Sequence, residues 1–428
     1  MKKRYILGYD LNSKYSQISF YNFEDEEPKT YEESEEAMQI PLALAFFNDR
    51  WVYGKEAKRL DTINQGVAFT NFFEQAKKRE KIVANGKTYD AVWLLAKYIR
   101  MTLSEYENIE YLTFTVSETD IDMSNLLKGI GQHLGVEKEN ISVQDYKESF
   151  AHYMYNQPKE LWQYEAALFY CDIYQMKAYM LRRLNPAKKN ENNRFITVDE
   201  VASAHINELM AIYPVYDEDQ ARYADEKFKS FVQGVFDKKV VSSVFLTGEG
   251  FENEWYPDSL RVLCNGRRAF LGNNLYSKGA CYYSYKMVES PNEGIIYLDD
   301  TRLLQRVCLH IKREGKEQWY PIVPWGSHWY EADNQWEVLL DNTRNIEVRV
   351  ESLASEELYT ESISLAGLVE RKDYSLRLQI NVMFLDEKTC RFTVKDVGFG
   401  DFYPATDFQT EKIIHLGGIH GQFNSMSS

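Results

Sequence analysis

The chain has 428 residues, enough for two or three domains, and 44% of them are hydrophobic. Its formal net charge of −15 argues against unaided binding to nucleic acid or to an anionic membrane, because both need clustered Lys and Arg. With only 10 prolines and no low-complexity run, most of the chain is expected to fold.

The start of the chain and its cysteines predict a cytoplasmic protein. Lys2–Arg4 lead into only a short apolar stretch, whereas a signal peptide needs a longer one. No run reaches the ~18 apolar residues of a membrane span. The five cysteines are scattered, contain no Cys-x-x-Cys pair and suit a reducing compartment. We therefore expect neither a nucleic-acid nor a membrane partner.

Strands and helices are predicted to alternate through roughly the first 290 residues, which is typical of an α/β domain. Strands are expected within residues 4–22, 41–47, 51–53, 111–116, 164–171, 195–198 and 240–246. Helices are expected at 54–62, 90–106, 120–134, 145–156, 199–211 and 217–236. The helix at 90–106 carries its apolar residues at helical spacing.

The pattern changes near Pro291 to short strands separated by polar turns. Strands are expected at 303–311, 318–323, 345–351, 358–364, 376–385 and 389–396. Apolar and polar residues alternate clearly in 346–350 and 376–382, as in strands with one buried face. The second half is therefore predicted to be an all-β sandwich.

Five short motifs occur in an order known from one protein family. Gly8–Ser13 resembles a first phosphate loop, and Phe245–Phe251 resembles an adenosine motif. Asn274–Cys281 resembles the helix that closes a nucleotide-binding domain. Ile295–Thr301 resembles an apolar-acidic interdomain linker, and Pro321–Pro324 resembles the Ile-Pro loop of a sandwich. Because these motifs occur in this order, the chain resembles DnaK and the other heat-shock 70 kDa chaperones of the actin-like ATPase superfamily.

The resemblance implies a division of the chain into domains. Residues 1–290 would form an actin-like (ribonuclease H-like) nucleotide-binding domain, and 291–301 the linker. Residues 302–416 would form a β-sandwich like the family's substrate-binding domain, followed by a loose tail at 417–428. No helical lid follows the sandwich, so the chain resembles a shortened member of the family.

Two departures from the family concern the nucleotide site. The second phosphate loop should be rich in glycine, but the corresponding segment, Asp172–Met176, contains none. The stretch from 172 to 247 is also too short for the whole lobe IIB, which supplies half of the family's adenine pocket. The family's catalytic Glu would fall near Tyr146–Ser149. We therefore expect ATPase activity to be weak or absent.

The resemblance nevertheless designates candidate residues for weak binding of ATP or ADP with Mg²⁺. These are Asp10, Asn12, Ser13, Asp172, Gly248 and Gly250. Asp10 and Asp172 are the two carboxylates that would hold Mg²⁺ through water, as oxygen ligands do. The alternative is that both aspartates, and Ser13, only cap turns at strand ends. Gly248 and Gly250 would let a nucleotide approach the backbone, or simply form a strand-to-helix turn.

In the sandwich, the resemblance places Ile346 and Val348 near a pocket for extended peptide, and it suggests that Leu298 of the linker docks on the nucleotide-binding domain. Six aromatic residues also gather in this half of the chain. They are Trp319, Tyr320, Trp325, Trp329, Tyr330 and Trp336. They either pack the core and edges of the sandwich or form a surface for a partner.

The sequence therefore predicts a chaperone or chaperone-like protein with a degenerate nucleotide site, which binds peptides or unfolded proteins through its sandwich. One alternative is a catalytically inactive actin-like scaffold that docks a dedicated protein partner. A second is an actin-like filament protein, which the sandwich and the net charge disfavour.

Overall fold

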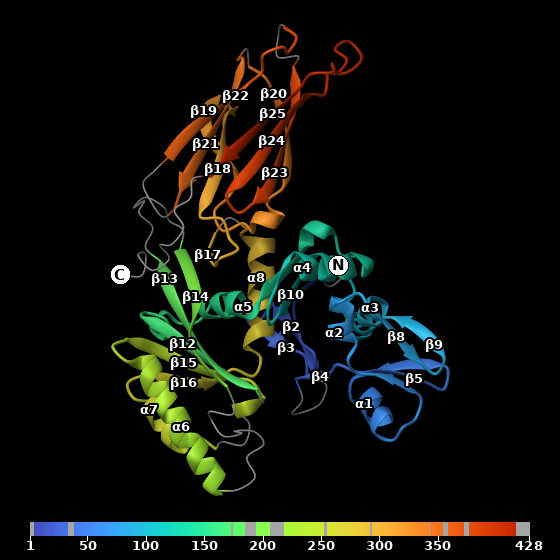
Figure 1. Ribbon diagram of the computed structural model, residues 1–428, viewed down its shortest axis with the longest axis vertical. Coiled ribbons are helices and arrows are strands. Elements are labelled where there is room, and N and C mark those ends of the chain that lie inside the picture. The colour runs from blue at the N-terminus through green and yellow to red at the C-terminus, as the bar shows by residue number, and fades with distance from the viewer. Residues whose placement is uncertain are drawn as a thin grey trace. The chain divides into compact units, whose positions relative to one another are not determined.

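The computed structural model describes residues 4–32, 38–172, 174–184, 194–205, 218–251, 255–291, 293–341, 343–353, 358–371 and 376–416. The chain divides into two compact units (Figure 1). Unit 1 comprises Met1–Arg182 and Val198–Ile295, and unit 2 comprises Arg183–Thr197 and Ile296–Ser428. Unit 2 therefore combines a short internal segment with the C-terminal part of the chain.

The first large sheet of unit 1 has the strand order β11-β10-β1-β2-β3, with β4 paired to β2. Its strands are β1 (Tyr5–Leu11), β2 (Tyr15–Asn22), β3 (Glu27–Thr30), β4 (Ile40–Pro41), β10 (Ile109–Val116) and β11 (Ile141–Asp145). β1 runs antiparallel to β2 and parallel to β10, which runs parallel to β11. β1 and β10 are mostly buried, as central strands covered on both faces are.

The second large sheet has the order β16-β15-β12-β13-β14-β17. Its strands are β12 (Glu165–Cys171), β13 (Gln175–Leu184), β14 (Arg194–His205), β15 (Val241–Thr247), β16 (Arg268–Leu271) and β17 (Ile295–Tyr297). β12 runs antiparallel to β13 and parallel to β15, which runs parallel to β16. Five strands of each sheet share one topology. If β1, β2, β3, β10 and β11 are renumbered 1 to 5 along the chain, their order across the sheet is 5-4-1-2-3. Strands β12–β16, renumbered in the same way, have the same order.

Helices pack against these two sheets and against the smaller strands of unit 1. Those in the described residues are α1 (Gly54–Thr62), α2 (Phe72–Lys77), α3 (Ala91–Thr102), α4 (Ile121–His133), α5 (Tyr146–Tyr155), α6 (Glu218–Phe236), α7 (Pro257–Leu263) and α8 (Leu275–Glu289). Aspartates begin α4 and α5, because Asp120 accepts the backbone N–H of Met123 at 2.7 Å and Asp145 accepts that of Glu148 at 2.8 Å. These caps fix where each helix starts.

Helix α8 packs very closely against β1 and α5. A Cβ added to Gly8 would lie 2.2 Å from the carbonyl oxygen of Ser277, and one added to Gly279 would lie 1.9 Å from that of Ser149. Only glycine permits backbones to approach this closely. The first two turns of α8 are thereby held beside the middle of β1.

Smaller strands lie between β4 and β10 in the chain. They are β5 (Leu44–Phe47), β6 (Arg50–Tyr53), β7 (Val67–Phe69), β8 (Lys81–Ala84) and β9 (Lys87–Asp90). The first three form a sheet of order β6-β5-β7, and the last two form a hairpin. Asn48 and Asp49 adopt φ values of 50° and 58° in the turn between β5 and β6, where the sequence predicts a turn.

One predicted helix of unit 1 is wrong. Residues 199–205 belong to strand β14, and the remainder of the expected helix, 206–211, lies outside the described residues. Alanine and glutamate gave this segment a helical composition, but pairing in a sheet outweighs such a propensity. Strand β13 was not predicted, although Met176, Ala178 and Met180 alternate into the core. The α/β character of this half of the chain is confirmed.

Unit 2 contains two four-stranded sheets, of orders β19-β18-β21-β22 and β20-β23-β24-β25. Their strands are β18 (Gln305–Arg313), β19 (Lys316–Val323), β20 (Asn334–Leu339), β21 (Asn345–Ser352), β22 (Leu358–Ser364), β23 (Arg377–Asp386), β24 (Thr389–Asp396) and β25 (Gln409–His415). Residues from both sheets share one apolar core, so the unit is a sandwich. The β-rich second half is confirmed, whereas β20 and β25 were not predicted.

A second apolar cluster of unit 2 joins the internal segment to the C-terminal part. It consists of Leu184, Phe195, Leu298, Trp325 and Leu353. The backbone N–H of Leu298 also donates to the carbonyl of Ile196 at 2.9 Å. Leu298 is therefore fully buried inside unit 2. The tail predicted at 417–428 lies outside the described residues.

No helix in the described part of the chain combines the length and the apolar character that a membrane span needs.

Candidate functional site

Asp10 is a buried carboxylate near the end of β1, and only 1% of its surface is exposed. The hydroxyl of Tyr146 donates a hydrogen bond to Asp10 Oδ1 at 2.8 Å. Burial raises the pKa of Asp10 to about 7, although hydrogen bonds from Tyr146 and from the Leu11 amide act in the opposite direction. Near neutral pH this carboxyl group is therefore partly protonated. Its protonated form accepts a hydrogen bond from metal-bound water less well than an ionised aspartate does.

The tyrosine that binds this carboxylate is stacked on a second tyrosine. Tyr146 is the first residue of α5, which the cap at Asp145 positions, and Tyr276 lies in the first turn of α8. Their ring centroids are 3.9 Å apart and their planes differ by 5°. Burial, followed by the nearby charge of Asp10, raises the pKa of Tyr146 well above its ordinary value. Tyr146 therefore stays protonated and keeps its hydrogen bond to Asp10.

Asn12 and Ser13 lie in the turn between β1 and β2. Asn12 Oδ1 accepts the backbone N–H groups of Lys14 and Tyr15, both at 2.9 Å. Its amide nitrogen lies 3.4 Å from the hydroxyl of Tyr146. Ser13 is exposed. Asn12 thus stabilises its own turn and also reaches the group that binds Asp10.

Asp172 performs the same task in the turn between β12 and β13. Its Oδ1 accepts the backbone N–H of Tyr174 at 2.7 Å and of Gln175 at 2.9 Å. Its Oδ2 accepts the hydroxyl of Tyr170 at 3.0 Å. All three contacts hold the aspartate to its own hairpin.

The register of the two hairpins shows which positions correspond. The backbone of Asn12 pairs with Tyr15, as that of Asp172 pairs with Gln175, each through an N–H···O bond of 3.1 Å. Asp172 therefore stands where the first sheet has Asn12. Two residues earlier in each strand, Asp10 of β1 corresponds to Tyr170 of β12, because β1 pairs with β2 in the same register as β12 pairs with β13. The second sheet has no carboxylate at the position of Asp10.

Gly248 and Gly250 follow β15 and pack on the end of β12. Gly248 has a φ of 98°, and a Cβ added to it would lie 2.1 Å from the carbonyl oxygen of Cys171. A Cβ at Gly250 would lie 2.2 Å from the Sγ atom of Cys171. The backbone and side chain of Cys171 thus occupy the space beside these glycines that a Cβ atom would need. Between them, Glu249 forms an ion pair with Lys14, which brings the first turn to this segment.

The predicted site residues are therefore only partly brought together. Asp10 and Asn12 both contact the hydroxyl of Tyr146, whereas Asp172 forms its hydrogen bonds within its own turn. The described residues contain no group of three or more His, Cys, Asp or Glu side chains placed to hold a metal ion. Ile346 and Val348 are buried in the core between the two sheets of the sandwich. A peptide would contact them only if that core opened.

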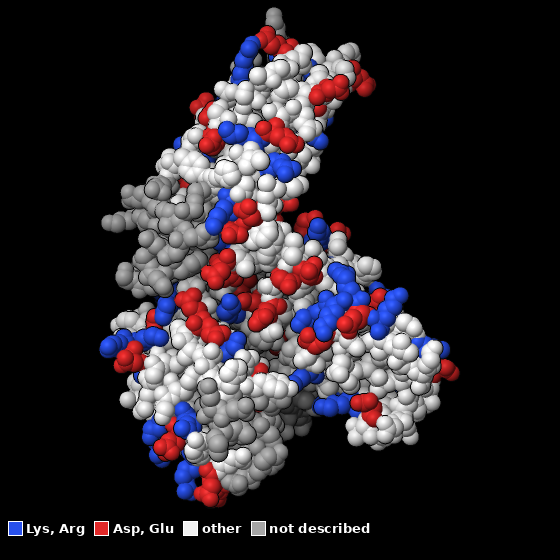
Figure 2. Space-filling model, viewed as in Figure 1, with Lys and Arg blue, Asp and Glu red and all other residues white. Residues whose placement is uncertain are grey.

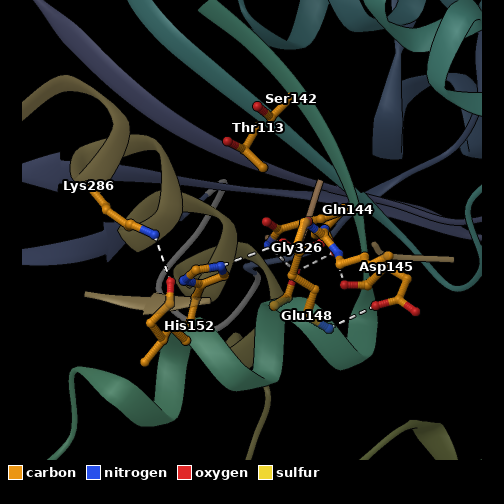
Figure 3. A network of polar contacts seen from close by, with 12 residues as sticks. Thr113, Ser142, Gln144, Asp145, Glu148, His152, Lys286 and Gly326 are labelled. Atoms are coloured by element: carbon orange, nitrogen blue, oxygen red, sulfur yellow. Dashed lines mark hydrogen bonds and ion pairs between the residues drawn. The ribbon is translucent and has the colours of Figure 1, made fainter. Parts of the chain in front are cut away.

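Figure 3 shows a polar network beside the site, at the end of β11 and along α5. Gln144 Nε2 donates to Ser149 Oγ, which lies 2.6 Å from the hydroxyl of Thr115. On the same helix, Glu148 and His152 are both buried, with 3.6 Å between Oε1 and Nε2. Glu148 lies in the segment where the resemblance places a catalytic glutamate.

A small pocket of unit 1 was not predicted. It has a volume of about 250 Å³ and lies between α2 and α4. It is lined by Ala76, Lys77, Lys78, Arg79, Asp120, Asp122, Met123 and Leu126. Lys and Arg side chains gather on this side of unit 1 in Figure 2, although the chain as a whole is acidic. Three consecutive basic residues, 77–79, were the only sequence signal for it.

Two comparisons with known families cover most of the chain. A model described as the C-terminal part of a family of unknown function, DUF5716, matches residues 26–300. A model described as a domain of unknown function, DUF8552, matches residues 302–416. No curated protein matches the chain. The roles of Tyr146, which binds Asp10, and of Tyr276, which stacks on Tyr146, were not predicted. No local motif marks them, because they lie on separate helices.

Proposed function

The chain belongs to the DUF5716 family, and we propose that it is a chaperone-like binding protein of the heat-shock 70 type whose actin-like domain has no working ATPase site. In this proposal, the sandwich of unit 2 binds a peptide or a protein client. Binding of ATP or ADP is weak or absent, and the nucleotide-binding domain serves as a scaffold.

The doubled strand order supports the actin-like part of the proposal. An actin-like domain is built from two ribonuclease H-like sheets, and both large sheets of unit 1 have the order 5-4-1-2-3. The two antiparallel four-stranded sheets of unit 2 suit the proposed client-binding sandwich. Fold alone does not define function, so the argument rests on the site.

The observation that carries the proposal is the packing of Gly248 and Gly250 on Cys171. In a working site, glycines leave room for phosphate beside the backbone. Here that room is filled, and the carboxyl group of Asp10 is bound by Tyr146. Loss of one positioned donor can cost roughly 10²–10³ in rate, so several such losses bring hydrolysis near background.

Client binding would use main-chain hydrogen bonds at a sheet edge. The edge strands of the sandwich are β19, β22, β20 and β25. Of the aromatic cluster, Trp325 is buried, whereas Trp319 and Trp336 are half-buried, so the cluster is divided between core and surface. Apolar peptides are expected to bind at about micromolar concentration or more weakly.

Calorimetric titration with ATP and ADP, with and without Mg²⁺, tests the first part of the proposal, together with a phosphate-release assay. We expect no turnover above a control without protein. Turnover that is lost in Asp10→Asn would overturn the proposal. Fluorescence anisotropy with short apolar peptides tests the second part. If no member of a diverse peptide library binds, the dedicated-partner scaffold becomes the better explanation.

A further inference from the structure

The loop Val397–Phe408, which joins β24 to β25 (Figure 1), displays aromatic side chains to solvent. Phe402 is 94% exposed, Phe399 is 47% exposed and Tyr403 is 42% exposed. No other large hydrophobic side chain of the described residues is as exposed as Phe402. We call Val397–Phe408 the aromatic loop. Clustered exposed aromatic residues mark interaction sites, because they supply most of the binding energy at interfaces.

The aromatic loop is held in a fixed shape from beneath. Asp396 is buried, and its carboxylate accepts the backbone N–H of Gly398 at 2.9 Å and both the backbone N–H and the hydroxyl of Thr406, at 3.0 and 2.8 Å. Arg371 adds an ion pair at 3.2 Å. Burial alone would raise the pKa of Asp396, but these contacts hold it below its ordinary value.

Further backbone bonds close the loop on itself. Phe399 N–H donates to the carbonyl of Tyr403 at 2.7 Å, and the N–H of Tyr403 donates to that of Gly400 at 3.2 Å. At the base, Asp396 N–H donates to the carbonyl of Phe408 at 3.2 Å. The aromatic side chains are therefore presented on an ordered backbone, which lowers the entropy cost of binding a partner.

The charges around the loop indicate the chemistry of the partner. Asp401 and Asp407 are exposed, and their carboxylates have no ion-pair or hydrogen-bond partner within the described residues. The nearby cations are engaged by the loop itself, since Arg371 donates to the carbonyl of Pro404 at 2.6 Å and Arg377 to that of Gly398 at 3.0 Å. Acidic side chains are visible over this end of the sandwich in Figure 2.

We propose that the aromatic loop docks a basic amphipathic segment of a partner protein, with apolar side chains on Phe399 and Phe402 and Lys or Arg beside Asp401 and Asp407. An anionic membrane does not fit this combination, because its surface repels the two carboxylates. A second copy of this chain is also disfavoured, since each copy carries a net charge of −15. The loop is distinct from the sheet edges that would bind an extended client.

The probe is a synthetic amphipathic peptide of Leu and Lys, roughly 14 residues or four helical turns long. A peptide with Glu in place of every Lys is its control. Anisotropy of the labelled peptides is measured on the full chain and on the variants Phe402→Ser and Asp401→Asn/Asp407→Asn. The matched control variant is Met383→Ser, which replaces another exposed apolar residue of the sandwich, 49% exposed, on the inner strand β23.

We expect the Leu/Lys peptide to bind and the Leu/Glu peptide not to bind. Phe402→Ser should weaken binding at least about 10-fold without a change in charge. The double aspartate variant should weaken binding and reduce its salt dependence, whereas Met383→Ser should bind as the native protein does. Equal binding by Phe402→Ser and the native protein, or equal binding of both peptides, would overturn the proposal.

A further measurement separates this proposal from the proposed function. An uncharged apolar peptide, bound at a sheet edge, should bind Phe402→Ser and the native protein with the same affinity. If that peptide fails to bind either protein while the Leu/Lys peptide still depends on Phe402, client binding fails and the aromatic loop stands.

Discussion

The two large sheets of unit 1 have the same strand order but different chemistry at their first hairpin. In the first sheet, β1 carries the buried Asp10 and the turn is capped by Asn12. In the second, β12 carries Tyr170 at the corresponding position and the turn is capped by Asp172. A shared topology therefore does not place equivalent functional groups at equivalent positions. The two aspartates that looked like a pair are not related by register.

The difference extends to the strand beside each hairpin. Val116 ends β10 in the first sheet, whereas Gly248 follows β15 in the second and packs on the backbone of the neighbouring strand. The first hairpin thus contains a titratable buried group, and the second contains close backbone packing. Each property can be removed separately by a single substitution.

The largest effect is expected for Gly248→Ala. The new Cβ would lie 2.1 Å from a backbone oxygen and on a residue with a φ of 98°. We expect the free energy of unfolding to fall by about 3 kcal/mol or more, measured by urea denaturation. Gly266→Ala is the matched control, because its φ is 72° but no atom lies within 4 Å of the added Cβ. Equal losses in the two variants would show that Gly248 is not tightly packed.

Asp10→Asn should flatten the dependence of stability on pH. The pKa of Asp10 is about 7 in the folded protein and 3.8 in an ordinary setting, so the folded state holds a proton that the unfolded state has released. The stability that this bound proton contributes is fully present below about pH 4. It is lost as the pH rises through 7, at no more than ~1.4 kcal/mol per pH unit.

Between pH 5 and pH 7 the native protein should therefore lose up to about 3 kcal/mol that Asp10→Asn does not lose. Urea denaturation at pH 5, 6 and 7 measures both slopes. Asp172→Asn makes the same chemical change in the second hairpin and is the control. If Asp10→Asn and the native protein have the same slope, the carboxyl group does not hold its proton in the folded state.

Tyr146→Phe should have a smaller effect, and it should extend the pH-dependent loss of stability rather than flatten it. The Tyr146 hydroxyl lowers the pKa of Asp10, so its removal should raise that pKa and move the loss of stability to higher pH. The ring and its stacking on Tyr276 are retained. We expect about 1–2 kcal/mol less stability at pH 8, where the ionised carboxylate loses its donor. An unchanged pH midpoint in urea denaturation would argue against the hydrogen bond.

The smallest effects are expected for Asn12→Ala and Asp172→Ala. Each removes a side chain that caps its own hairpin, which should cost about 1 kcal/mol in both variants. If Asp172 serves only its turn, calorimetric titration with ADP and Mg²⁺ should give the same result for Asp172→Ala and the native protein. Loss of a measurable nucleotide affinity in this variant alone would restore the metal role expected for Asp172.

Much of the strand pattern could be predicted from the sequence, because burial on one face leaves an alternating signal. Strand β24 alternates without interruption, and β15 is buried along almost its whole length, with β-branched and aromatic residues in it. A strand was predicted at 195–198, but the second half of β14, 199–205, was missed because it is only partly buried and contains good helix formers. Here the neighbouring strand decided the structure, and no local signal reveals that neighbour.

The candidate site was less predictable for a similar reason. Asp10 was identified from a motif at the end of a strand, but Tyr146, which binds its carboxylate, and Tyr276, which stacks on Tyr146, are separated from it by many residues and several elements. Asp172 was chosen by its identity as an aspartate, whereas only the register of β12 and β13 shows that it corresponds to Asn12. The aromatic loop depends on Asp396, whose buried contacts come from both sides of the loop.

The apolar cluster around Leu298 affects where the sandwich can be separated from the rest of the chain. Leu184 and Phe195 come from the internal segment, more than a hundred residues before Trp325 and Leu353, which they cover. A fragment that begins after residue 295 would expose Leu298, Trp325 and Leu353 to water and would tend to associate through them. A sandwich separated from the chain at residue 295 is therefore expected to be less prone to associate when the segment 183–197 is kept with it.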